Sequence, residues 1–114
     1  MAEIGNVVRL TDDVYYGTNK EKDHVFITNI YDGKFDGIGI TEHQKFIGCN
    51  LENWQETNEK LFTNAGNKIL LTKKHEGVYN IDIENIGYIG FGFVKELQTM
   101  ISKLIVNEYA RIYS

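Results

Sequence analysis

HVFITNIYDGKFDGIGIT, residues 24–41, joins two runs of β-branched and aromatic residues through Asp32-Gly33. An Asp-Gly pair between such runs is typical of a two-residue hairpin loop, because a type I′ turn needs positive φ at both central positions. In that hairpin Tyr31 faces Lys34, and the pairing continues outward in step. The rest of the chain is expected to be organised around this hairpin.

Continuous pairing places His24 opposite Thr41 at the open end of the hairpin, and the alternation of side chains sorts the residues onto two faces. One face is apolar and is expected to be core: Val25, Ile27, Ile38 and Ile40. The other face is mixed: His24, Phe26, Thr28, Gly37, Gly39 and Thr41. Because its two glycines leave bare backbone beside an aromatic ring, the mixed face is expected to form a groove.

Length and composition predict one globular domain, residues 1–114. Hydrophobic residues make up 42% of the chain and charged residues 25%, which is ordinary for a globular protein. No apolar run approaches the roughly 18–20 residues that cross a membrane, and the first ten residues lack the layout of a signal peptide. With one cysteine, Cys49, and three widely spaced histidines, no disulfide, metal motif or cofactor is expected. These features favour a cytoplasmic protein.

Charge limits the classes of function. The formal net charge is −4, and Arg9 and Arg111 are the only arginines. This balance argues against sequence-independent binding of nucleic-acid phosphates, because such binding needs a basic face. It does not exclude a local strip of basic residues. The lack of proline and the frequent Asn, Lys and Ile indicate AT-biased coding, as in a low-GC bacterium, its phage or another mobile element.

Outside the hairpin, short strands and turns are expected along most of the chain. Strands are expected at residues 5–10, 45–49, 67–73, 77–83 and 86–89, with a further short piece at 14–16. The other segments are expected to be a polar loop at 17–23, a short helix or ordered excursion at 51–62, and a glycine-rich hinge at 90–93.

The spacing of apolar residues changes from two to about 3.6 at Val94, which predicts an amphipathic helix over residues 94–112. Its apolar stripe consists of Val94, Leu97, Ile101, Leu104, Ile105 and Ile112. A single helix cannot bury its own stripe, so this one is expected to pack on a sheet. The predicted fold class is α+β, mainly β: a small barrel of short, twisted strands closed by one C-terminal α-helix.

This order of parts resembles the MazF/PemK-like toxin family. The matching features are Gly5-Asn6-Val7-Val8, the polar loop that leads into HVFIT, Ile38-Gly39-Ile40-Thr41, and the runs 67–71 and 81–86 before the terminal helix. The resemblance implies an SH3-like barrel that forms a cytosolic homodimer. It also implies an endoribonuclease that cleaves single-stranded RNA without a metal ion and is bound by an antitoxin protein.

In active members of that family, an arginine at the end of the first loop and a threonine that closes the third strand carry the chemistry. The resemblance implies Thr41 for the threonine, whereas the arginine position is taken by Lys20, Lys22 and His24. Histidine titrates near neutral pH and serves as an acid or base. The implied roles are acid/base for His24, orientation of the scissile phosphate for Thr41, flanking phosphate contacts for Lys20 and Lys22, and groove contacts to RNA for Phe26 and Thr28.

Structural roles for these residues stay open beside the functional ones. His24 and Thr41 fit a polar pair at a solvated hairpin end, the two lysines fit a solvated loop, and Phe26 fits a second core face. The acidic balance and the missing arginine also fit a non-catalytic phage or mobile-element protein that docks on a host protein and inhibits it. Basic potential at the groove would support the nuclease, and an exposed apolar patch elsewhere would support the binding protein.

Overall fold

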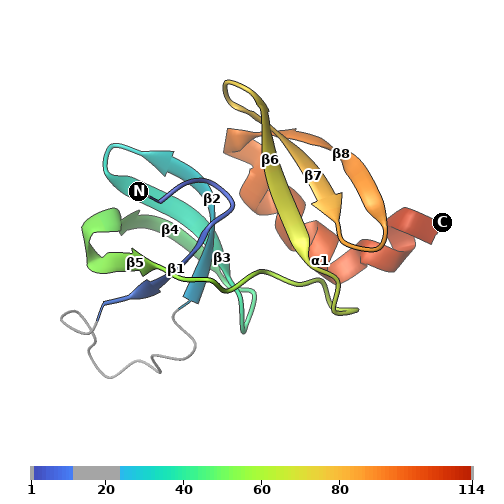
Figure 1. The fold of residues 1–114 in the computed structure, drawn as a ribbon, viewed down its shortest axis with the longest axis horizontal. Helices are drawn as coiled ribbons and strands as arrows, with labels where there is room; N and C mark the ends of the chain where they lie inside the picture. Colours follow the sequence, from blue (N-terminus) through green and yellow to red (C-terminus); the bar gives the residue numbers. More distant parts are fainter. Residues whose placement is uncertain (1, 12–23, 114) are drawn as a thin grey trace. The chain divides into compact units, whose positions relative to one another are not determined.

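The computed structural model describes residues 2–11 and 24–113, with side chains described as far as Asn107. The described chain is mainly β with one α-helix at its C-terminal end, as the sequence predicts (Figure 1). Its internal contacts group it into two compact units, residues 1–60 and residues 61–114. The single-domain organisation stays a prediction. Over the described ranges, no helix has the length and apolar character needed to cross a membrane.

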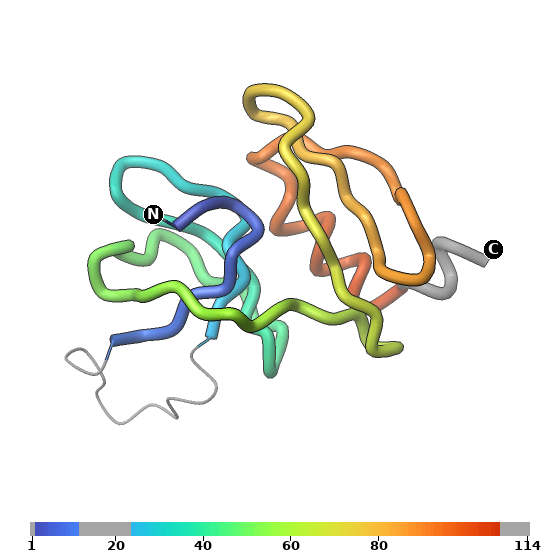
Figure 2. Tube along the Cα trace, viewed as in Figure 1, coloured from blue at the N-terminus to red at the C-terminus, as the bar shows by residue number. Residues whose placement is uncertain are grey.

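The first unit is a five-stranded antiparallel sheet in the order β4-β3-β2-β1-β5. Its strands are β1 (Val7–Leu10), β2 (His24–Tyr31), β3 (Lys34–Gly39), β4 (Lys45–Asn50) and β5 (Trp54–Glu56). Figure 2 shows the chain after β4 turning back to run alongside β1, where β5 pairs with it. A buried cluster of Val8, Val25, Ile27 and Phe35 forms the core of this unit.

The predicted hairpin loop is confirmed. Tyr31 faces Lys34 across the pair β2–β3, as expected for a two-residue connection. Asp32 has φ 49° and Gly33 has φ 73°, so both central positions are in the left-handed region that a type I′ turn needs. Asp tolerates this conformation better than most residues with a side chain, and glycine adopts it without steric cost.

The predicted register fails beyond the loop, because β2 contains a bulge at Thr28. Asn29 still faces Asp36, but Ile27 faces Gly37, so Thr28 is an extra residue on β2. The amide of Ile40 donates to the main-chain oxygen of His24 at 2.9 Å. The predicted pairing of His24 with Thr41 is therefore wrong by one residue.

The mixed face of the hairpin does not form the expected groove. Phe26 is 1% exposed and Thr28 is fully buried, as Gly37 and Gly39 are. Four consecutive residues of β2, Val25 to Thr28, are thus buried, so both faces of the strand are covered here. Phe26 therefore belongs to a second core face of β2, which is the structural alternative that the sequence left open.

The second unit combines a three-stranded antiparallel sheet with the C-terminal helix. The sheet runs in the order β6 (Ile69–His75), β7 (Val78–Ile83) and β8 (Gly87–Phe93), and helix α1 (Leu97–Tyr113) lies against one of its faces (Figure 1). Four of the six predicted stripe residues, Leu97, Ile101, Leu104 and Ile105, are buried, which confirms the amphipathic pattern. A 3₁₀ turn, η4 (Val94–Glu96), precedes the helix, so α1 begins three residues later than predicted.

Two local predictions are corrected: the helical alternative for residues 51–62 and the hinge at residues 90–93. Residues 51–62 do not form a helix: a 3₁₀ turn, η3 (Leu51–Asn53), is followed by β5, whose Trp54 pairs with Leu10. Residues 90–93 are the end of β8 and not a hinge. In the first segment pairing with the distant strand β1 overrides the local pattern, and in the second the residues pair with the neighbouring strand β7. The described strands form two open sheets, and neither sheet closes on itself as a barrel.

Gly37→Ala is expected to destabilise the protein by about 1–3 kcal/mol, because a Cβ at this position would collide with the main-chain oxygen of Phe26 and with Val25 Cγ1. The matched control is Gly39→Ala, where the nearest atom is the flexible Phe46 ring edge at 3.2 Å, and a smaller loss is expected. Urea denaturation measures both. Equal midpoints for Gly37→Ala and the wild type would contradict the close packing of β2 on β3.

Candidate functional site

A row of polar side chains crosses three strands of the first unit. Arg9 on β1 pairs with His24 on β2 on one side and with Gln55 on β5 on the other. Directly paired residues of antiparallel strands project from the same face of the sheet, with Cβ atoms roughly 4.5–5.5 Å apart. Strand pairing therefore brings an amide, a guanidinium and an imidazole together in one line.

The guanidinium of Arg9 is held by its neighbours. With the Gln55 amide oriented so that its oxygen faces Arg9, this oxygen accepts from Arg9 Nε at 2.9 Å and also from Nη2. Arg9 Nη1 donates to the main-chain oxygen of Leu10 at 3.3 Å. Because a guanidinium is planar, contacts on two sides fix its plane.

His24 has a carboxylate partner. Its Nε2 lies 3.4 Å from Glu59 Oε1, and its side chain is 12% exposed against 48% for Glu59. Thr57 holds the main chain at Glu59, since its Oγ1 donates to the main-chain oxygen of Val7 at 3.0 Å and accepts from the Glu59 main-chain amide at 3.1 Å. The imidazole is thus largely covered, while the carboxylate beside it remains open to solvent.

These groups define the candidate site: Arg9, His24, Gln55 and Glu59. An imidazole can accept and donate a proton, and a carboxylate beside it can accept a hydrogen bond from a ring N–H. An oriented guanidinium can donate two parallel hydrogen bonds to a phosphate or a carboxylate. The arrangement therefore suits acid/base chemistry on an anionic substrate.

The structure separates the residues that the sequence grouped together. His24 is part of the candidate site, but Thr41 is an exposed residue of the turn after β3 and does not face it across the hairpin. Phe26 and Thr28 are buried, and the Thr28 hydroxyl donates to the main-chain oxygen of Asp36 at 3.2 Å. Lys20 and Lys22 lie outside the described residues.

Sequence reasoning missed Arg9, Gln55 and Glu59. The sequence did offer a reason to consider Arg9. It is a charged residue directly after the apolar pair Val7-Val8 in a predicted strand, so its side chain is expected at the edge of the buried region. The sequence offered none for Gln55 and Glu59, since their segment was expected to be helical. Their role depends on the pairing of β5 with β1, which the local pattern does not contain.

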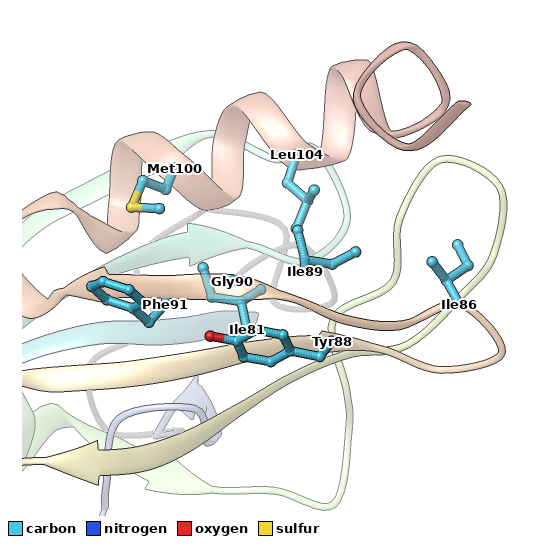
Figure 3. Close-up of a pocket in the computed structure, with 8 residues that line it drawn as sticks. All are labelled: Ile81, Ile86, Tyr88, Ile89, Gly90, Phe91, Met100 and Leu104. Atoms are coloured by element: carbon cyan, nitrogen blue, oxygen red, sulfur yellow. The ribbon is translucent and has the colours of Figure 1, made fainter. Parts of the chain in front are cut away.

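A separate cavity of about 500 Å³ lies in the second unit between β8 and α1 (Figure 3). It is lined from the sheet by Ile81, Ile86, Tyr88, Ile89, Gly90 and Phe91, and from the helix by Met100 and Leu104. A Cβ built on Gly90 would meet no atom within 4 Å, so the missing side chain leaves part of this space open. Apart from the Tyr88 hydroxyl, the side chains that line it are apolar, so they form no acid/base pair.

Comparisons with protein-family models, with curated proteins and with solved structures found no match to this chain. Over residues 2–11 and 24–113, no group of three or more His, Cys, Asp or Glu side chains is arranged to hold a metal ion. The candidate site is therefore described by its own geometry.

Cys49 is expected to react slowly with iodoacetamide in the native protein. Burial raises the pKa of its thiol, and the nearby Asp36 carboxylate raises it further, so less thiolate is present at a given pH than in the unfolded chain. Mass spectrometry of alkylation between pH 7 and 10 should show a native rate several-fold lower at pH 8, with its rise displaced to higher pH. Coincident pH profiles of native and urea-unfolded protein would contradict this environment.

Proposed function

We propose that this protein is an endoribonuclease that cleaves single-stranded RNA with the side chains of the candidate site and without a metal ion. The observation that carries the proposal is the His24–Glu59 contact of 3.4 Å on the same sheet row as the oriented guanidinium of Arg9. RNA contains its own nucleophile, the 2′-hydroxyl, so its cleavage needs a proton acceptor, a proton donor and a cation for the phosphate.

His24 supplies both proton transfers in this proposal. Its imidazole removes the 2′-hydroxyl proton while that oxygen attacks phosphorus, and the resulting imidazolium protonates the departing 5′-oxygen. The products are a 2′,3′-cyclic phosphate and a 5′-hydroxyl end. Glu59 stabilises the imidazolium between the two steps. Arg9 donates to the non-bridging phosphate oxygens, where negative charge increases in the transition state.

The proposal gives the family's arginine role to Arg9, which comes from β1 and not from the first loop. In this reading the chain is a distant relative of MazF/PemK-like toxins, and its strands are a divergent form of the SH3-like barrel. The partners would be single-stranded RNA, a second copy of the chain in a homodimer, and an antitoxin protein. Support comes from the order of strands before a terminal helix and from the pairing of a basic residue with His24.

A second candidate function is a binding protein that docks on a host protein without catalysis. The observation that favours it is a group of exposed aromatic side chains on β8, an edge strand of its sheet: Tyr88, Phe91 and Phe93 are 59%, 47% and 55% exposed. Exposed aromatic residues are typical of protein interfaces. In this case the contact of His24 with Glu59 is structural.

RNA cleavage in EDTA tests the nuclease. Wild-type protein is expected to cleave a long single-stranded RNA and to leave 2′,3′-cyclic phosphate ends, whereas His24→Ala is expected to lose at least about 100-fold in rate, the ordinary contribution of an acid/base group. Arg9→Lys is expected to lose about tenfold or more, because an ammonium cannot make the bidentate phosphate contact.

Two variants serve as controls in the same assay. His75→Ala removes an exposed imidazole of β6, and Thr41→Ala removes the hydroxyl that continuous strand pairing was expected to place opposite His24. Both variants are expected to keep the wild-type rate within a few-fold. Intact RNA with folded wild-type protein would reject the nuclease and favour the binding protein. Full activity in His24→Ala would reject the assigned site.

A further inference from the structure

The cavity between β8 and α1 reaches the outer edge of its sheet. It is lined by four consecutive residues of β8, Tyr88 to Phe91 (Figure 3). Successive side chains of a strand point to opposite faces, so a space that touches all four residues lies along an edge of the strand and not on one face alone. Because β7 pairs with the other edge, the cavity borders the edge of β8 that has no strand partner within the described residues.

This edge presents main-chain groups. In a strand at the edge of an antiparallel sheet, about half of the N–H and C=O groups point away from the one paired strand. Six of the seven residues of β8 keep some exposure to solvent, and only Gly92 is buried. The side chains of the cavity are apolar apart from the Tyr88 hydroxyl, so a polar ligand finds mainly main-chain partners there. A ligand that fits both features carries its own N–H and C=O groups beside apolar side chains.

β8 also differs from the other strands at sheet edges. Charged side chains and very short strands protect an edge from pairing with another chain. β4 and β6 carry lysines, and β5 has only three residues, one of them Glu56. β8 has seven residues, GYIGFGF, none of them charged, and its one irregularity is the extra residue Ile89, which lines the cavity. The edge of β8 is therefore suited to pairing with another strand.

A second copy of β8 fits this edge poorly. The three glycines of the strand pair with alternate residues of β7 and so share one face: Gly87, Gly90 and Gly92. A Cβ on Gly92 would meet Leu97 and Met100, so this face is the one that α1 covers. When a strand pairs antiparallel with its own copy around a two-fold axis, the same face of both strands lies on the same side. A second copy would thus bring three glycines toward a space of about 500 Å³ and leave most of it unfilled.

We propose that the edge of β8 binds an extended segment of another protein, which adds to the sheet as a further strand. Main-chain hydrogen bonds to β8 hold the segment, and large apolar side chains at alternate positions enter the cavity. Gly90 leaves room for one of them, since a Cβ built there meets no atom within 4 Å. The site shares no residue with the proposed nuclease site, so it stands whether or not that function holds. It goes beyond docking on a host protein, because it names the conformation and the side chains of the bound segment.

A short peptide tests the proposal. The probe is KVTVTVK with blocked ends and a fluorescent label, in which valines alternate with threonines. Fluorescence anisotropy is expected to show saturable binding, and amide hydrogen exchange is expected to slow within residues 87–93 when the peptide is present. The same peptide with N-methyl groups on all amides between the lysines keeps the side chains but cannot donate hydrogen bonds, and it is expected to bind at least about tenfold more weakly.

Three results would overturn the proposal. The first is a lack of saturable binding, or equal binding of the two peptides. The second is binding that leaves the exchange of the β8 amides unchanged. The third is slow exchange at β8 in the free protein that becomes slower with protein concentration, because a second copy would then occupy the edge.

Two substitutions locate the peptide at the cavity. Ile89→Lys and Ile86→Lys each put an ammonium into the apolar lining, and Ile86 lies in the turn before β8, outside the strand pairing. Both are expected to weaken binding about tenfold or more. The control Ile47→Lys makes the same change on β4, an edge strand of the first unit, where the side chain is 72% exposed, and is expected to bind like the wild type. Undiminished binding by folded Ile86→Lys, or an equal loss in the control, would contradict the assigned site.

Discussion

The Asp36 carboxylate holds the strand register on which the first unit depends. Its Oδ1 accepts from the Tyr31 hydroxyl at 2.7 Å and from the Gly48 amide at 2.8 Å, and the same bond to Tyr31 raises the pKa of that phenol. The main-chain oxygen of Asp36 accepts from the hydroxyl of Thr28. Asp36 therefore contacts two bulges, one on β2 and one on β4, the strands that flank β3. Bulges of this kind bend a sheet and redirect the side chains beyond them.

The bulge also decides the surroundings of His24. The bulge at Thr28 places His24 next to Ile40, the apolar residue that directly follows β3, and the Ile40 amide donates to the His24 main-chain oxygen. Its polar neighbours come from the other side of the strand, where β1 supplies Arg9, and from Glu59, which follows β5. The candidate site therefore belongs to β2, β1 and the chain that follows β5, and not to the hairpin that the sequence emphasised.

The sequence predicted what depends on neighbouring residues and missed what depends on distant ones. The Asp32-Gly33 loop and the buried stripe of α1 follow from turn chemistry and from a period of 3.6, and both are present. The bulge at Thr28 depends on an acceptor eight residues away, and Gln55 meets Arg9 only because β5 returns to β1. The helical spacing of residues 51–62 did not predict strand β5, because strand pairing can override a short local pattern.

Charge explains why the geometry of the candidate site matters more than its composition. A chain with net charge −4 repels a polyanion at long range, so it cannot rely on the broad electrostatic attraction that serves basic nucleic-acid-binding proteins. One guanidinium contributes more when its plane is already fixed, because less side-chain entropy is lost when a phosphate binds. Gln55 provides that orientation for Arg9, and Thr57 fixes the main chain at Glu59. In the proposed nuclease, prepositioned side chains take the place of a basic surface.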